Sequence, residues 1–213
     1  MNFHFAIIGA LALLPSLAQP ATAQVPSRFK APATEQLTTE QKAWADSISG
    51  PPRNADFAKP PYRAYLQSPE LAKRLSALSD YLRWNSSLKP RLSEMAILIA
   101  ARHWTAQYEW FAHYPLALKA GLDPSIAGAI SAGKRPDPMQ ADEAALYDLA
   151  TELYRDKHVT DATYKAAFAQ HGERGIMDII GIIGYYDLVS MTLITMEAKP
   201  PNDSVPLLPP LGK

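Results

Sequence analysis

Residues 90–113 read PRLSEMAILIAARHWTAQYEWFAH, and this stretch decides the fold. Positions 95–101 are apolar almost all round, a pattern typical of a helix buried at the centre of a helical protein. Glu94, Glu109 and His113 interrupt the apolar pattern with ionisable groups. Because buried carboxylates are seldom left without a partner, we expect the chemistry of the protein to lie in this region.

Helical patterns continue on both sides of this stretch and predict an all-α fold. A helix beginning at Pro69 would place four leucines on one face, at positions 71, 75, 78 and 82. Start and stop signals predict further helices over residues 38–49, 125–132, 137–157, 160–172 and 176–196. No run alternates apolar and polar residues as a strand would, and no glycine-rich phosphate loop is present.

The chain divides into four segments. Residues 1–23 carry no Lys, Arg, Asp or Glu and end in Ala-Thr-Ala, which is typical of a secretory signal peptide. Residues 24–61 are rich in proline and small residues and predict an extended N-terminal arm. Residues 62–199 form the predicted helical domain, and residues 200–213 a proline-rich C-terminal tail. We therefore expect a periplasmic or secreted protein.

Composition excludes several classes of partner and mechanism. Lys+Arg and Asp+Glu both number 21, so no basic excess points to a nucleic-acid partner. Cysteine is absent, which removes every mechanism that needs a thiol. The apolar residues 176–196 include Asp178 and Asp187. We interpret them as a core helix and expect no stable membrane span after signal cleavage, although length alone is ambiguous.

The spacing of the ionisable groups suggests an acid–base site. Glu109 and His113 share one helix face, where a carboxylate can orient an imidazole and favour its charged form; the alternative is an ordinary surface ion pair. Glu94 would lie about 22 Å from Glu109 in one straight helix. The two can meet only if the helix breaks, with Thr105 as a new N-cap, or if a second subunit contributes. The alternative for Glu94 is a salt bridge to Arg91.

Three neighbours are candidate substrate-binding residues. Arg102 could bind a substrate carboxylate, or pair with a structural carboxylate. Tyr108 could donate a proton or line the pocket. His103 could contact substrate, although structural histidines are more common. Neither Glu-x-x-His nor His-Glu-x-x-His occurs in this region, so we expect no metal and no other cofactor.

These residues give the chain a resemblance to the carboxymuconolactone decarboxylase / alkylhydroperoxidase AhpD-like superfamily. The resemblance spans about residues 61–199, and residues 90–98 and 106–122 carry it. It implies an all-α bundle that assembles as trimers or hexamers, with sites near subunit contacts. In the peroxidase branch a glutamate precedes Cys-x-x-Cys and a histidine. Glu94 and His113 match the glutamate and the histidine of this pattern, but Ala106 and Glu109 stand at the two cysteine positions.

The thiol peroxidase activity of that branch therefore cannot apply to this chain. The decarboxylase branch also lacks the cysteine pair, and there the resemblance matches His113 to the acid–base histidine. We expect a cofactor-independent lyase, a decarboxylase or isomerase of a small lactone or keto acid, with Glu109 orienting His113 and Glu94 as a second proton-transfer group. One alternative is a non-catalytic binding or assembly protein on the same fold. The other is a metal-dependent enzyme using Glu94, Glu109 and His113.

Overall fold

The computed structural model describes residues 28–211, and the only regular secondary structure in this part of the chain is helical, with no strand. The expected signal peptide, residues 1–23, lies outside the described residues. Within these residues a 3-10 turn, Thr34–Gln36, precedes eight α-helices, which confirms the all-α prediction. They are α1 (Thr39–Ser49), α2 (Tyr62–Tyr65), α3 (Pro69–Trp84), α4 (Pro90–Trp104), α5 (Gln107–Lys119), α6 (Pro124–Ser131), α7 (Ala141–Asp156) and α8 (Asp161–Thr195).

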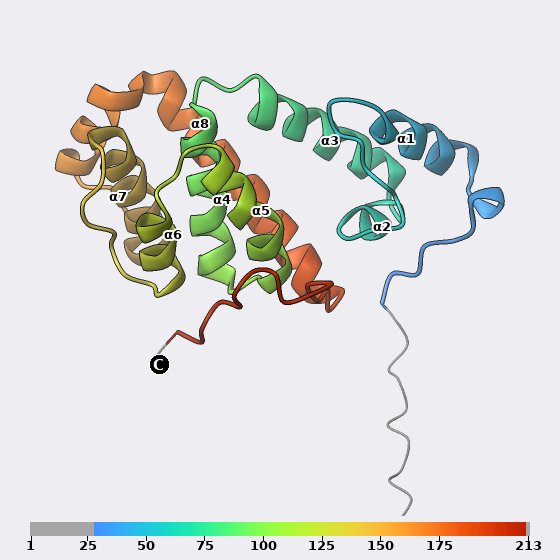
Figure 1. Ribbon diagram of the computed structural model, residues 1–213. Coiled ribbons are helices and arrows are strands. Elements are labelled where there is room, and N and C mark those ends of the chain that lie inside the picture. The colour runs from blue at the N-terminus through green and yellow to red at the C-terminus, as the bar shows by residue number, and fades with distance from the viewer. Residues whose placement is uncertain (1–27, 212–213) are drawn as a thin grey trace, which may run out of the picture.

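Helix α4 forms the centre of the molecule, as its sequence predicts. It packs against α3, α5, α6, α7 and α8 (Figure 1). Every residue from Leu92 to Arg102 is buried except Glu94, whose side chain is partly exposed. Small side chains at Ala96 and Ala100 are completely buried, which allows the neighbouring helices to approach closely. The central helix therefore carries one carboxylate to the edge of the core.

Helices α1 to α3 lie beside the α4–α8 bundle rather than within it (Figure 1). Thr38 caps α1, because its side chain accepts a hydrogen bond from the backbone N–H of Gln41. The leucine face predicted for α3 is only half buried. Leu75 and Leu82 are buried, but Leu71 and Leu78 are exposed, because α3 meets α8 along a narrow strip.

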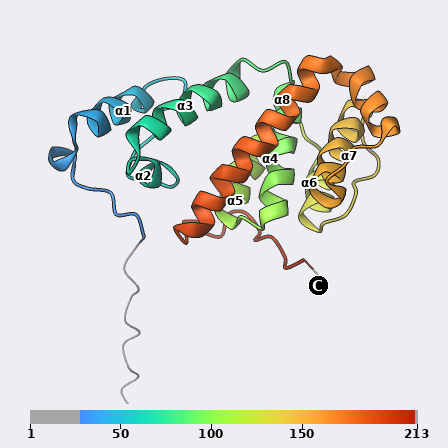
Figure 2. The same ribbon diagram turned by 180° about the vertical axis from the view of Figure 1, so that it is seen from behind.

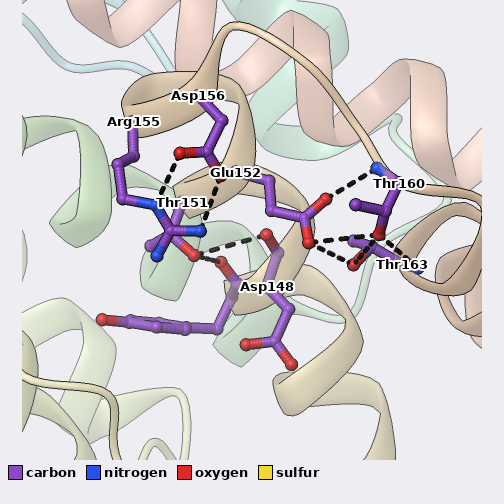
Figure 3. Close-up of polar contacts among 8 residues, drawn as sticks. Asp148, Thr151, Glu152, Arg155, Asp156, Thr160 and Thr163 are labelled. Atoms are coloured by element: carbon purple, nitrogen blue, oxygen red, sulfur yellow. Dashed lines mark hydrogen bonds and ion pairs between the residues drawn. The ribbon is translucent and has the colours of Figure 1, made fainter.

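The turn between α7 and α8 is held by a polar cluster. Figure 3 shows Glu152 of α7 pointing toward Thr160 and Thr163 at the start of α8. Its carboxylate accepts hydrogen bonds from the backbone N–H of Thr160 at 2.9 Å and from the hydroxyl of Thr163 at 2.6 Å. Thr160 in turn caps α8. Carboxylate oxygens at a helix N-terminus satisfy free N–H groups, so this cluster fixes where α8 begins.

Helix α8 bends at Gly172 and then runs along the outside of α4 (Figure 2). The bend falls where the sequence predicts one helix to end and another to begin. By length and composition α8 could cross a membrane, but 56% of its most apolar window is buried inside the molecule. Buried Asp178 lies in this helix and accepts hydrogen bonds from Tyr81 and from the backbone and hydroxyl of Ser87. These contacts are those of a core helix.

The proline-rich tail lies across the ends of α4 and α5 (Figure 1). Gln107 pairs with both the N–H and the carbonyl of Leu208, and Arg102 donates to the carbonyl of Pro209 at 2.7 Å. Val205 and Leu208 are buried. The tail thus covers the junction where α4 turns into α5.

Candidate active site

A chain reversal at Thr105 brings the predicted acid–base groups together. Thr105 was expected to be the N-cap of the second helix. It is instead the C-cap of α4, with a left-handed backbone (φ 52°), and Ala106 is the N-cap of α5. Helix α5 then packs back against α4. Glu94 and His113 therefore meet within one chain, without a second subunit.

His113 lies between two carboxylates. Its Nδ1 is 2.6 Å from Oε2 of Glu94, a short hydrogen bond between the imidazole and the carboxylate. Its Nε2 is 3.1 Å from Oε1 of Glu109, but this oxygen is not aligned for a hydrogen bond and is left without one in the buried interior. The ring also meets the edge of Tyr186, with centroids 5.1 Å apart. Glu94 thus orients the imidazole, and Nε2 is turned toward Glu109.

The structure contradicts two alternatives: a surface ion pair between Glu109 and His113, and a salt bridge between Glu94 and Arg91. The side chains of His113 and Glu109 are 7% and 4% exposed, so they are not an ordinary surface pair. Arg91 does not pair with Glu94, because it reaches Asp142 and Glu143 of α7 instead. The cation near Glu94 is Arg83 of α3, whose Nη2 lies 3.7 Å from Oε1.

Burial raises the pKa of Glu109 and of two tyrosines beside it. Burial raises the pKa of Glu109, and the charge of Glu94 adds to this, while His113 and Arg83 oppose it. The raised pKa favours a neutral Glu109 that can donate a proton. Burial also raises the pKa of Tyr186 well above its usual value and that of Tyr185 to about 12, so both phenols stay neutral.

The Glu109–His113 pair lines a cavity of about 220 Å³. The cavity lies between α5 and α8 on one side and α2, α3 and the α1–α2 connection on the other. This volume lies below the roughly 300–1,000 Å³ of pockets for drug-sized ligands, so it suits a small molecule. Larger hollows of about 750 and 440 Å³ lie elsewhere and do not include these groups. The cavity is lined by Arg53, Pro60, Pro61, Tyr62, Tyr65, Ser79, Arg83, Tyr108, Glu109, Ala112, His113, Leu116, Tyr185, Tyr186 and Val189.

Two of the three expected substrate-binding residues lie away from this cavity. Tyr108 lines it, as expected of a pocket residue. Arg102, however, donates to Pro209 of the tail, and His103 is stacked on Tyr154 with ring centroids 4.0 Å apart. Both line the separate hollow of about 440 Å³. The guanidinium of Arg102 therefore anchors the tail and does not line the cavity beside His113.

Two arginines that sequence reasoning missed face the cavity instead. Arg53 comes from the segment expected to be an extended arm, and Arg83 from the end of α3. Both guanidinium groups lie over the ring of Trp84, at 5.2 and 5.6 Å from its centroid. No local spacing links either arginine to His113, so only the packing of α3 against the bundle reveals them.

The donor set does not form a metal centre. Glu94 and Glu109 approach opposite ring nitrogens of His113, so the three groups do not converge on one point. Within residues 28–211, no group of three or more histidine, aspartate or glutamate side chains is arranged to hold a metal ion. The geometry therefore lends no support to the metal-dependent alternative.

Comparison with solved structures identifies the fold. An alkylhydroperoxidase AhpD core protein from Ralstonia eutropha, an uncharacterised peroxidase-related protein, is 19% identical with a TM-score of 0.67, over 85% of this chain and 95% of the other. A peroxidase-related protein from Silicibacter gives 16% identity and 0.64, over 84% and 94%. A protein of unknown function from Agrobacterium tumefaciens, described as a candidate AhpD antioxidant defence protein, gives 18% and 0.59, over 66% and 97%.

No protein-family model matches the sequence, and a search of curated proteins finds no match. The structural likeness is nevertheless extensive, since the chain spans nearly the whole length of all three neighbours. At these identities the likeness concerns the fold and not the activity. The protein thus has the all-α AhpD-like fold, with a carboxylate–imidazole–carboxylate cluster and no cysteine.

Proposed function

We propose that the protein is a cofactor-independent acid–base lyase, a decarboxylase or isomerase of a small lactone or keto acid. The observation that carries this proposal is the alignment of Glu94, His113 and Glu109 beside a small cavity. A histidine held by one carboxylate and facing another is suited to proton transfer. With no cysteine in the chain, thiol peroxidase chemistry has no nucleophile.

The proposed decarboxylation needs an electron sink and a proton donor. The bond between the substrate carboxylate and the neighbouring carbon breaks, CO2 leaves, and the electron pair moves onto the adjacent carbonyl as an enolate. Glu109 or protonated His113 then delivers a proton to that carbon. An isomerase would use the same two groups, with His113 removing a proton at one carbon and Glu109 supplying one at another.

The geometry supports a different division of roles from the one expected from sequence. Glu94 makes the short contact to Nδ1 and is the orienting group. Glu109 faces Nε2 and the cavity, and its raised pKa suits a proton donor. Glu94 thus takes the orienting role that the sequence suggests for Glu109, and Glu109 takes the proton-transfer role that the sequence suggests for Glu94.

A non-catalytic binding protein on the same fold is the second candidate. That alternative predicts Glu94 and His113 turned to bulk solvent without a pocket. Their side chains are only 12% and 7% exposed, and His113 lines the cavity. Burying ionisable groups costs stability, and such groups beside a cavity are typical of functional sites, which favours the acid–base proposal.

The test is a turnover assay on a panel of lactone acids and β-keto acids, with and without chelator, following substrate loss and CO2 together. We expect CO2 release that is insensitive to chelator and falls at least about a hundredfold in His113→Ala. His158→Ala, an exposed histidine between α7 and α8, is the matched control. Unchanged turnover in His113→Ala would remove the assignment, and no turnover across the panel would favour the binding protein.

We also propose that the mature protein is a homo-oligomer, a trimer or hexamer, in the periplasm or outside the cell. The resemblance supports the oligomer, and the exposed leucines of α3 support it physically. The uncharged, apolar character of residues 1–23 supports the location.

A further inference from the structure

Arg83 stands out among the cations of the cavity because its guanidinium is half buried and poorly satisfied. Its side chain is 28% exposed. Within residues 28–211 it makes one ion contact, to Glu94 at 3.7 Å, and it has no hydrogen bond. A guanidinium carries five N–H donors in a planar fork that matches a carboxylate. The N–H groups of Arg83 are therefore available to bind a ligand at the wall of the cavity.

Arg53 offers a contrast on the same wall. Its guanidinium donates to Ser79 and to the carbonyl of Ser76, and it forms an ion pair with Asp80. Its charge and most of its donors are thus used within the protein. Arg83 shares the ring of Trp84 with Arg53, but it lacks the hydrogen bonds that Arg53 makes.

The charges around Arg83 leave room for an added anion. Glu94 is the one carboxylate shared between Arg83 and His113. Burial raises the pKa of Glu109, which favours its neutral form and removes a charge that would repel an anion. Opposite charges attract strongly in a site shielded from water, so a bound carboxylate would be stabilised there.

We propose that Arg83 is the substrate-recognition residue of this cavity and that it binds the carboxylate of a small organic acid. One oxygen of Glu94 lies 3.7 Å from Arg83, and the other lies 2.6 Å from His113. Arg83, His113 and Glu109 line the same cavity, so a small acid held by Arg83 would have its neighbouring carbons in the space beside the imidazole and Glu109. This inference rests on the proposed acid–base function and assigns to Arg83 the part that the sequence suggested for Arg102.

The test compares a carboxylate with a neutral molecule of the same size. Levulinate and levulinamide differ only in the charged group, and both are titrated into the purified protein by ligand-observed NMR. We expect wild type to prefer levulinate. In Arg83→Gln its affinity should fall about tenfold, the loss of one charge-assisted hydrogen bond, with levulinamide unchanged. Arg74→Gln removes an exposed arginine of the same helix and is the control.

A merely structural role for Arg83 would weaken both probes equally, and this result would overturn the inference. So would equal affinity of wild type for the two probes. If Arg83→Gln lowers the melting temperature, Arg83→Lys carries the test, and we expect a reduced but persistent preference for levulinate. Failure of the proposed function is separate: levulinate would still bind through Arg83, but no acid of the panel would show His113-dependent turnover.

Discussion

At the scale of single residues, position along two packed helices gives chemically identical side chains different roles. Glu94 sits at the edge of the core, and its Oε2 lies 2.6 Å from Nδ1 of His113. Glu109 is fully enclosed, and its Oε1 has no hydrogen bond. Because a carboxylate without water or donors favours its neutral form, burial raises the pKa of Glu109.

The first prediction concerns Glu109→Gln. Burial raises the folded-state pKa of Glu109 above its usual value of 4.5. The unfolded chain therefore ionises first as pH rises, and the stability contributed by neutral Glu109 is lost above about pH 4.5. The free energy of unfolding of wild type minus that of Glu109→Gln should fall toward neutrality, with a slope of at most about 1.4 kcal/mol per pH unit.

Urea unfolding at a series of pH values measures this difference. Glu70→Gln, which alters an exposed glutamate paired with Arg74, controls for the loss of one carboxylate. A difference that grows with pH would mean that Glu109 is held ionised by His113 and Arg83, against the effect of burial.

Sequence reasoning identified the ionisable groups but not their partners. Glu94, Glu109 and His113 were predictable because charge in an apolar helix is uncommon. The contact between Glu94 and His113 depends on the reversal at Thr105, a β-branched residue in a left-handed conformation that sequence rules do not favour. Arg83 carries no signal, because its distance to the site is set by how α3 packs.

At the scale of elements, Asp178 fastens α8 to the connection between α3 and α4. Its Oδ2 accepts the backbone N–H and hydroxyl of Ser87 at 2.7 and 2.6 Å, and its Oδ1 accepts the hydroxyl of Tyr81 at 2.8 Å. The same connection positions Arg83 at the end of α3. The charged side chain of Asp178 in an otherwise apolar helix thus links α8, which lines the cavity, to α3, which carries Arg83.

The second prediction follows from these contacts. Burial alone would raise the pKa of Asp178, but the hydrogen bonds from Ser87 and Tyr81 and the charge of Arg174 outweigh it and lower the pKa below its usual 3.8. The stability that Asp178 contributes is therefore complete above about pH 4 and is lost as pH falls through the lowered value. Asp178→Asn should cost about 1–3 kcal/mol at neutral pH and less in acid.

Unfolding free energies of wild type and Asp178→Asn at neutral and acidic pH check this expectation. Asp203→Asn alters an exposed aspartate of the tail and serves as the control. A cost that stays constant down to the acid transition would show that the hydrogen bonds do not depend on the charge.

The positions of the helices could be predicted well from the sequence, but which of their faces are buried could be predicted less well. The buried helix from Pro90, the cap at Thr38 and the break near Gly172 follow from local chemistry. The exposure of Leu71 and Leu78 does not, because periodicity shows only that a face is apolar and not what covers it.

At the scale of the whole molecule, an apolar stripe runs along the outer face of α8. Met177, Ile180, Met191 and Ile194 recur at helical spacing and are 38–63% exposed. Exposed Leu71 lines, together with Met191, an apolar hollow between α3 and α8. Scattered exposed apolar residues are normal in proteins, but exposed apolar residues that recur on one face of a helix are typical of an interaction surface.

The last prediction is that this stripe is the contact of the proposed homo-oligomer. A charge buried between subunits without a partner opposes association strongly, whereas the same charge on a free surface changes stability by less than about 0.5 kcal/mol. Met191→Glu should therefore convert the oligomer to a folded monomer with an unchanged circular dichroism spectrum. Light scattering coupled to size-exclusion chromatography measures the mass, with Lys165→Glu on an exposed part of α8 as the control. A wild type that is monomeric at every concentration, or a Met191→Glu oligomer of full mass, would mean that the stripe faces solvent.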